Sequence, residues 1–499
     1  MTIRQLRFIS VSYLLLPNLL FFFFWTNSIL AAFCLGICVW LYYSEFRDQQ
    51  FPRAAALRLP EIFKILLTGA VLSLLAGVCG FFYQTDDYWA HNTKFYELFT
   101  HDWPLRIPTH GPVVGYYYGY YVVPAFISKI AGQLSEAAIL GWTMLGMSLG
   151  VAWLYISLGH KIRYMLPVLT IGDFGHFCSS AVSKLFGVRY PLEHFGIEMW
   201  SNFENLFWVP NQIIPSMLMG GMLVYGVRQG IAAERMVFPI VLSLWWAVFP
   251  AFTSLVLVAA MVAGKWFKRR LTGFTLDEIC AALLPLILAV PVLLLFISHE
   301  RPAVIGWIWN FNSRFGYRLL EYGLNVGVNV AVMIFLYRYF SRNDRTRKLD
   351  AAFYLAAILL LILPLVRIGK VNDLLIRGFM PLLITAGLST FHFASVFDFH
   401  KKRFSSRITV TMLLVTFCIL GSSLPGIGRV VRAMKVNAIS TQLLPASISF
   451  EPVPYDAYAN VYEVLRARWS QTEADQYLGK SDSVYERFIA PECGRARND

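Results

Sequence analysis

Charged residues are scarce in this sequence. Only 15% of its 499 residues are charged and 57% are hydrophobic, whereas a soluble globular chain has about 25% charged and roughly 45–50% apolar residues. A soluble protein of this length needs charged side chains to solvate its surface, so lipid must cover most of this one. The composition therefore excludes a water-soluble enzyme and predicts an all-α polytopic membrane protein.

Paired cysteines are absent as well. The seven cysteines are scattered, and most lie in apolar runs, where they are typical of small core residues. The sequence has no CxxC pair and no His/Cys spacing for a structural zinc ion. It also has no N-x-[ST] sequon and no retention signal, which favours a bacterial inner membrane over an endoplasmic reticulum.

Basic residues occur in short clusters between apolar segments and give the chain a net charge of +13. This is the pattern of the positive-inside rule, by which Lys and Arg gather in cytoplasmic loops. No stretch offers a basic stripe interleaved with exposed aromatic residues, so no nucleic-acid partner is expected. The clusters are Arg4/Arg7, Arg47 to Lys64, Lys161/Arg163, Arg228/Arg235, Lys265 to Arg270, Arg338 to Lys348, and Lys401 to Arg407.

Apolar runs long enough to cross the hydrocarbon core predict about thirteen transmembrane helices. If the first cluster lies in the cytoplasm, alternation of the crossings places every other cluster there too. The expected helices lie near 8–25, 28–43, 62–83, 136–160, 165–182, 209–227, 237–249, 251–266, 277–297, 317–340, 351–368, 376–397 and 408–425.

The same alternation sends five segments to the outer, non-cytoplasmic face. They are 84–135, 183–208, 298–316, 369–375 and the tail from Gly426 to Asp499. We therefore expect residues 1–61 to form a transmembrane hairpin and a cytoplasmic linker, and 62–425 to form the transmembrane core. Residues 426–499 form a small outer tail, in which YDAYANVYEVLRARW predicts an amphipathic helix.

Ionisable residues are most concentrated in the first outer loop, 84–135. Asp86 and Asp87 directly follow the helix expected over 62–83. Paired carboxylates at a membrane surface can accept a proton from an attacking hydroxyl or ligate a divalent cation. His91 and Lys94 follow Asp87 at i+4 and i+7, so the three share a face of a helix. The alternative is that the acidic pair only caps that helix, because Asp is a favoured N-cap residue.

Three motifs follow one another in residues 85–163: TDDYW, then HGPVVGYYYGYYVVPAFISKIAG, then EAAILGWTMLGMSLGVAWLYISLGHKIR. Their order resembles the GT-C superfamily of membrane glycosyltransferases, which holds the protein O-mannosyltransferases and the aminoarabinose transferase of lipid A. In that superfamily an acidic motif opens the first outer loop, an interfacial segment follows, and a helix then ends at a basic cytoplasmic turn. The chain departs from the pattern in having DD instead of DE, in Gly111 between His110 and Pro112, and in the added hairpin 8–43.

The resemblance implies a GT-C-like fold with interfacial helices in the first outer loop. It also implies transfer of a sugar from a polyprenyl-phosphate donor to an acceptor lipid, glycan or protein of the cell envelope, on the periplasmic face. Asp86 or Asp87 is then similar to the catalytic aspartate of the group. Segment 112–131, which includes Tyr117, is expected to line the opening through which the donor arrives from the membrane lipids. A divalent metal cation is left open as a cofactor, with Asp86, Asp87 and Glu193 as its candidate ligands.

Two further outer segments carry candidate substrate-binding residues, which join His91, Lys94 and Tyr117. Cations on an outer loop run against the positive-inside bias. Arginine and lysine bind phosphate well, but they also serve as snorkelling anchors at helix ends. Acidic residues among aromatic ones suit a sugar, but they also occur in amphipathic interfacial helices. The candidates are Arg367, Lys370, Asn372 and Arg377 in the late loop, and Glu193 and Glu198 in the second outer loop.

Two polar features are open to a structural as well as a functional interpretation. Asp173 and His176 lie in an otherwise apolar run, where ionisable groups usually face the protein interior. We interpret them as structural, with cavity lining as the alternative. The tail motif QYLGKSDSVYERF is either a solvated surface or a lid over the cavity.

Two other functions remain as alternatives to a glycosyltransferase. A transporter or flippase is expected to have inverted repeats and polar, broken helices at the bilayer midplane, and the sequence has no convincing internal repeat. An O-antigen-type ligase or polymerase is expected to rely on Arg and His in a large late loop, whereas the richest loop here is the first. Since likeness of fold carries much of this argument, both alternatives stay open.

Overall fold

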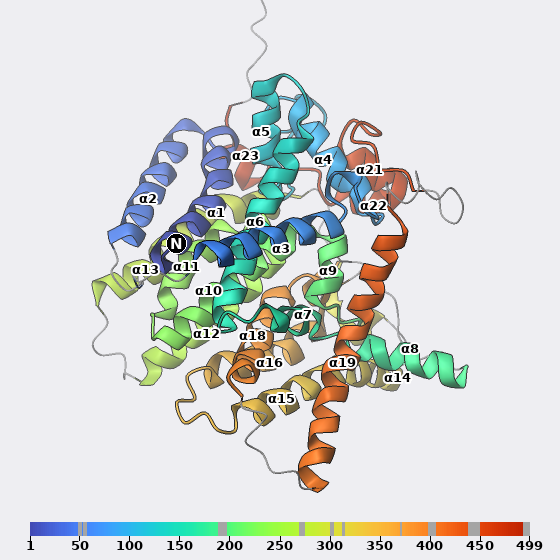
Figure 1. Cartoon of the computed structure of the whole chain (residues 1–499). Helices are drawn as coiled ribbons and strands as arrows, with labels where there is room; N and C mark the ends of the chain where they lie inside the picture. The colour runs from blue at the N-terminus through green and yellow to red at the C-terminus, as the bar shows by residue number, and fades with distance from the viewer. Residues whose placement is uncertain are drawn as a thin grey trace, which may run out of the picture.

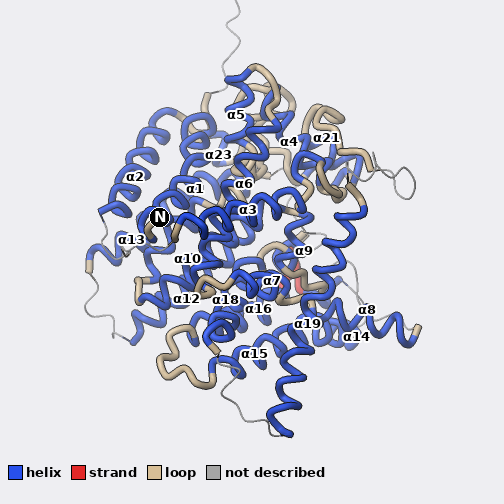
Figure 2. Tube along the Cα trace, in the orientation of Figure 1, coloured by secondary structure: helices blue, strands red, loops and turns tan. Residues whose placement is uncertain are grey.

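The chain is almost entirely helical (Figures 1 and 2). A computed structural model describes residues 1–47, 52, 57–187, 197–268, 275–299, 304–311, 315–369, 372–397, 406–437 and 450–492. Within these residues, eight helical segments are long and apolar enough to cross a membrane. The prediction of an all-α, multi-pass integral membrane protein is therefore confirmed, while the count of thirteen crossings stays a prediction. The eight segments are Ile3–Trp25, Ser28–Glu45, Glu136–Ser157, Val248–Phe267, Leu276–Phe296, Phe315–Ser341, Asp373–Val396 and Val410–Lys435.

The N-terminal hairpin consists of α1 (Ile3–Trp25) and α2 (Ser28–Arg47). Thr2 and Gln5 form a capping box at the start of α1, which satisfies backbone N–H groups that a helix end leaves free. The two helices pack against each other through the Phe8 and Tyr42 rings, 5.1 Å apart, and through the buried ion pair of Arg7 with Glu45 at 3.0 Å.

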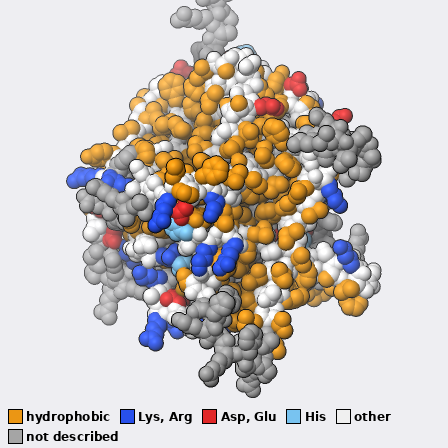
Figure 3. All heavy atoms as spheres, viewed as in Figure 1, with side chains coloured by type: hydrophobic (Ala, Val, Ile, Leu, Met, Phe, Trp, Pro, Cys, Tyr) orange, Lys and Arg blue, Asp and Glu red, His pale blue; other side chains and the backbone are white. Residues whose placement is uncertain are grey.

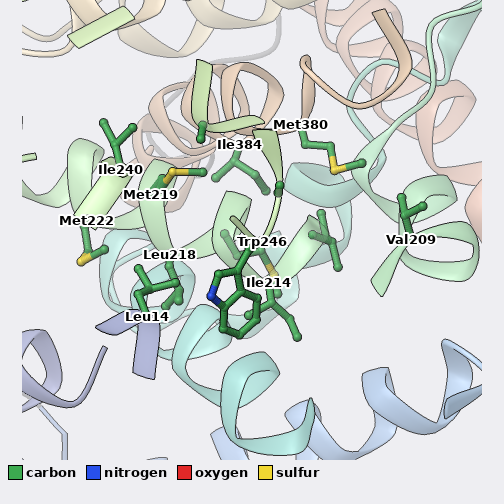
Figure 4. Close-up of a cluster of buried hydrophobic side chains, with 14 of the residues drawn as sticks. Leu14, Val209, Ile214, Leu218, Met219, Met222, Ile240, Trp246, Met380 and Ile384 are labelled. Atoms are coloured by element: carbon green, nitrogen blue, oxygen red, sulfur yellow. The ribbon is translucent and has the colours of Figure 1, made fainter. Parts of the chain in front are cut away.

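The core is built around α6 (Glu136–Ser157), α10 (Pro210–Gln229) and α18 (Met380–Val396), whose side chains are largely buried. Glycines let these helices approach closely: a Cβ on Gly220 would lie 2.9 Å from Ile384 Cβ, and one on Gly150 would lie 2.9 Å from Met217 Cβ. Figure 4 shows part of this core, with Met219 of α10 beside Ile384 of α18. Small residues at such crossings are typical of packed membrane helices.

Several expected helices are shorter or broken in the structure. The run 165–182 forms two helices, α7 (Met165–Thr170) and α8 (Phe174–Phe186), because Gly172 takes a φ of +106° between them. The run 62–83 becomes α3 (Leu59–Leu75), which ends before Gly77 at a φ of +87°. The run 317–340 contains α14 (Phe315–Tyr322), a π-helical turn over 323–327 and α15 (Val328–Ser341). A hydropathy profile reports the apolar character of a run and does not detect such breaks in its backbone.

The remaining elements include the long helices α12, α13 and α19 together with several shorter ones. They are α4 (Tyr88–Thr100), α5 (Val122–Ala131), α9 (Asn202–Trp208), α11 (Val237–Leu242), α12 (Val248–Lys268), α13 (Leu276–Phe296), α16 (Asp350–Ile362), α17 (Asp373–Ile376), α19 (Ser406–Lys435), α21 (Val461–Arg468), α22 (Gln471–Asp475) and α23 (Val484–Phe488). Strands β1 (Ile305–Trp307) and β2 (Val366–Ile368) pair antiparallel. In the first outer loop, 84–135, two helices form, α4 and α5.

The segments that carry basic clusters contact one another at one end of the molecule. The Met1 amino group donates to the Leu57 carbonyl at 2.9 Å. Nη2 of Arg7 donates to the carbonyl of Arg235 at 2.8 Å, and Nζ of Lys348 donates to that of Arg228 at 3.2 Å. In Figure 3, hydrophobic side chains cover most of the visible face, and Lys and Arg side chains gather toward its lower left. This arrangement suits a protein whose apolar belt lies in lipid.

The segments expected on the outer face contact one another at the other end of the molecule. Arg106 of the first outer loop pairs with Glu486 of the tail at 3.1 Å. The Lys480 amide donates to the Ser298 carbonyl at 2.8 Å, and the Asn27 side chain donates to the Phe488 carbonyl at 2.8 Å. The tail therefore packs on the first loop and on the turn between α1 and α2, as the red and blue segments in Figure 1 show.

Candidate functional site

A cavity of about 440 Å³ lies where α4, the segment 198–209, the segment 369–377, α19 and the tail meet. This volume is in the range of sites that enclose a whole small molecule. Several residues selected from the sequence line it, from four separate parts of the chain. They are Asp87, His91, Lys94, Tyr117, Glu198 and Arg377.

Asp87 stands at the N-cap position of α4, and α4 places His91 and Lys94 in the same cavity wall. Asp86, one residue earlier, is exposed and is not among the lining residues. The two carboxylates therefore have different surroundings. Burial raises the pKa of the Asp87 carboxyl, although the nearby cations Arg377 and Lys94 oppose the shift. A carboxylate with a raised pKa is a better proton acceptor than an ordinary aspartate.

Arg377 links the carboxylates on this side of the cavity. Its Nη1 lies 3.2 Å from Asp373 Oδ1 and donates to the Tyr117 hydroxyl at 3.2 Å. Its Nη2 lies 3.8 Å from Asp87 Oδ2. Asp373 is thus the closer partner, because it sits one helical turn before Arg377. Asp87 therefore lies near the Arg377 guanidinium but does not form a close ion pair with it.

Lys94 is enclosed by aromatic rings, and only 1% of its surface is exposed. Its Nζ lies 4.4 Å from the ring centre of Tyr116, 4.9 Å from that of Tyr121 and 5.2 Å from that of Tyr117. Burial lowers the pKa of Lys94 to about 7; Asp87 opposes this shift and Arg377 adds to it. The ammonium and neutral amine forms are therefore present in similar amounts near neutral pH.

His91 is held in one tautomer. Its Nε2 lies 2.8 Å from the Trp208 carbonyl oxygen, which can only accept, so Nε2 carries the proton. Burial holds the pKa of His91 well below its usual value, so the ring is neutral and Nδ1 accepts from the Tyr121 hydroxyl at 2.5 Å. The Tyr121 oxygen in turn accepts from Lys94 Nζ at 3.4 Å. His91 thus fixes Tyr121, and Tyr121 helps to fix Lys94.

A second set of charges surrounds α9. Glu198 Oε1 lies 2.6 Å from His176 Nε2, and His176 Nδ1 lies 3.4 Å from Asp173 Oδ1. Glu204 Oε1 accepts from the Trp208 indole N–H at 2.9 Å, while its other carboxylate oxygen pairs with Arg429 of α19. Asp173 and His176 lie behind this wall and are not among the lining residues, in agreement with a structural role.

The tail supplies one wall of the cavity, through Leu465, Trp469, Glu473, Gln476 and Tyr477. The Gly115 amide donates to the Tyr477 carbonyl at 3.0 Å, and the rings of Tyr116 and Tyr477 are 4.4 Å apart. The Val461 amide donates to Glu97 Oε2 at 3.1 Å. The first part of the QYLGKSDSVYERF motif therefore closes over the cavity, whereas Lys480 pairs with Asp482 at the surface.

Other residues selected from the sequence lie elsewhere. Arg367 is on β2, where its Nε donates to the Gly369 carbonyl at 3.2 Å, and Asn372 is fully buried at the start of α17. Neither is among the residues that line the cavity. Lys370 and Glu193 lie outside the described residues.

The described residues contain no group of three or more His, Cys, Asp or Glu side chains suited to a metal ion. Of the metal-ligand set expected from the sequence, Asp86 does not line the cavity with Asp87, and Glu193 is not described. The described part of that set therefore does not converge on one point. No family model, curated protein or solved structure matches the chain.

Some lining residues were not selected from the sequence. Glu204 and Asp373 were visible as acids in outer loops, but nothing distinguished them from solvated charges. Arg429 lies in the stretch predicted to be on the outer face, so it repeats the signal that selected Arg377, a cation against the positive-inside bias. Trp469 and Tyr477 had no local signal, because their place depends on how the tail packs.

Proposed function

We propose that the chain is a GT-C-type glycosyltransferase that moves a sugar from a polyprenyl-phosphate donor to an acceptor hydroxyl on the outer face of a bacterial inner membrane. The observation that carries the proposal is the group of Asp87, Lys94 and Arg377 in one cavity wall: a basic carboxylate beside two cations. Group transfer from a phosphate ester needs both, a proton acceptor for the attacking hydroxyl and cations for the leaving phosphate.

In this mechanism Asp87 takes the proton of the acceptor hydroxyl as its oxygen attacks the anomeric carbon of the donor. The bond from that carbon to the phosphate oxygen breaks, and the polyprenyl phosphate leaves with the electron pair. The leaving group gains negative charge, so Arg377 and Lys94 stabilise the transition state more than the bound donor. Tyr117, which accepts from Arg377, and Asp373, which pairs with it, hold the guanidinium in place.

The adjacent pair of aspartates provides a matched test. In Asp87→Asn the proton acceptor is lost, and we expect transfer from a radiolabelled polyprenyl-phosphate sugar to fall by about 10²-fold or more. Asp86→Asn removes an equal charge from the neighbouring exposed position and should keep activity within a few-fold of wild type. Full activity in the Asp87 variant would exclude this residue as the catalytic base.

A transporter or flippase is the second candidate, and one observation favours it. The break between α7 and α8 lies beside Asn329 of the 315–341 segment, where the Asn329 side chain accepts from the Gly175 amide at 3.2 Å. Broken helices with polar partners are typical of carriers. Closed vesicles separate the two functions: a labelled lipid-linked sugar that crosses the bilayer without forming a covalent product supports the carrier.

A further inference from the structure

The cavity has a second wall whose chemistry differs from that of the Asp87 side. Trp200 and Trp208 line it together, with ring centres 5.4 Å apart and ring planes inclined by 43°. Glu198 and Glu204 line the same region. Aromatic faces that can cover apolar C–H surface, together with carboxylates that accept from hydroxyl groups, are the two features a sugar ring requires.

This wall is held rigid before any ligand binds. The Ser201 hydroxyl caps α9 by accepting from the Glu204 amide at 3.2 Å, and it donates to Asp173 at 2.6 Å. The Trp208 indole N–H is fixed on Glu204, and Glu204 is fixed on Arg429. Binding groups whose positions are set by further hydrogen bonds lose little entropy when a ligand arrives.

One polar group in this wall points to a ligand that can donate. Asn205 is fully buried and lines the cavity. Its amide nitrogen donates to the carbonyls of Ser201 and Ile376, both at 3.1 Å. Its Oδ1 has no hydrogen-bond partner among the described residues. A buried acceptor left without a partner costs free energy, and a sugar hydroxyl would satisfy it.

The charges of this wall disfavour a phosphate. Among the described residues that line this wall, Glu198 and Glu204 stand with one cation, Arg429, so an anion is less favoured here than beside Lys94 and Arg377. The cations Lys94 and Arg377 line the Asp87 side of the same cavity, and hydrogen bonds from His91 to the Trp208 carbonyl and from Asn205 to the Ile376 carbonyl join α9 to that side. A phosphate therefore belongs with Lys94 and Arg377, and an uncharged ring belongs with the tryptophans.

We infer that the Trp200/Trp208 wall is the acceptor subsite and that the acceptor is a saccharide, bound through ring stacking and through hydroxyl contacts to Glu198 and Asn205. This inference rests on the proposed function, which places the donor phosphate at Lys94 and Arg377. Because both walls line one cavity, a saccharide on the tryptophans shares that cavity with Asp87, the residue that takes its hydroxyl proton.

The kinetic test uses the full-length protein and compares Trp208→Leu, Trp208→Phe and Trp307→Leu. Trp307 on β1 is half exposed and is not among the lining residues, so it is the matched control. With a radiolabelled polyprenyl-phosphate sugar as donor and short oligosaccharides as acceptors, Trp208→Leu should raise the acceptor KM by about tenfold or more and leave the donor KM unchanged. Trp208→Phe should recover part of the loss, and Trp307→Leu should match wild type.

A direct binding measurement separates failure of this inference from failure of the proposed function. Wild-type protein should bind a disaccharide from a panel of hexose and N-acetylhexosamine units, and Trp208→Leu should lose that binding while it still binds undecaprenyl phosphate. If the donor KM rises instead, if a peptide or phospholipid is the acceptor, or if no disaccharide binds, the inference is overturned. If undecaprenyl phosphate does not bind and no sugar is transferred, the proposed function fails, whatever the disaccharide result.

Discussion

Replacing Lys94 by methionine should stabilise the protein, and the gain in stability over wild type should be larger at low pH than at high pH. Lys94 is 1% exposed, and burial lowers its pKa from 10.5 to about 7. Below pH 7 the folded protein must hold a buried ammonium group that the unfolded chain keeps in water. The difference between the two pKa values corresponds to a penalty of about 5 kcal/mol.

The sign follows from proton binding. Between pH 7 and 10.5 the unfolded chain binds more protons at this lysine than the folded protein does, so wild-type stability rises with pH in that window. Methionine has no charge to bury and similar length, so the variant lacks this dependence. Its advantage over wild type is greatest below pH 7 and declines toward pH 10.5. Differences in apolar packing are constant with pH and cancel in the comparison.

The measurement is the apparent melting temperature of detergent-solubilised protein at pH 6, 7, 8.5 and 10. Lys480→Met is the control, because Lys480 is exposed in the tail beside Asp482, and its difference from wild type should not change with pH. Sugar transfer by Lys94→Met should fall most at pH 6, where the wild-type lysine is charged and its loss removes one of the phosphate cations. A Lys94→Met difference that is the same at pH 6 and pH 10 would refute the assignment of a buried, weakly basic amine.

Three further substitutions test the same cavity. Arg377→Lys loses the planar contacts to Asp373 and Tyr117 and should weaken undecaprenyl phosphate binding by about tenfold, whereas Arg367→Lys should not; equal effects would contradict the phosphate assignment. His91→Phe removes the hydrogen bonds to Tyr121 and Trp208 and should lower stability by about 1–3 kcal/mol, measured by chemical unfolding, with an unchanged midpoint as the contrary result. Burial raises the pKa of Glu97 to about 8. The folded wild type is therefore progressively destabilised as the pH rises from 4.5 through 8. Glu97→Gln should have a higher melting temperature than wild type above pH 8 but not near pH 4.

Local sequence pattern was sufficient to find one side of the cavity. Asp87, His91 and Lys94 follow helical spacing in α4, and three side chains on one helical face remain together in any fold that keeps the helix. Arg377 was selected because a cation in a predicted outer loop departs from the positive-inside rule. The choice between Asp86 and Asp87 could not be made, since it depends on how α4 is rotated against Arg377 and the tyrosines.

The rest of the site depends on contacts between distant segments. The break at Gly172 and Asp173 is compensated by Ser201, which donates to Asp173 and comes 28 residues later in the sequence. Hydropathy instead predicted one continuous helix there, because most of the run is apolar. Trp469 and Tyr477 reach the cavity because the tail packs on Glu97 and Gly115. The amphipathic helix predicted in the tail did not indicate which surface of the protein the tail packs against.

The tail wall has a consequence for the order in which the protein matures. Trp469 and Tyr477 follow the last long apolar helix in the chain, so the ribosome makes them after all the helices that they cover. The cavity therefore stays open toward the tail side until the tail emerges and docks, through Val461 on Glu97, Tyr477 on Gly115 and Phe488 on the α1–α2 turn. A nascent chain with its membrane helices already inserted therefore still has an incomplete cavity.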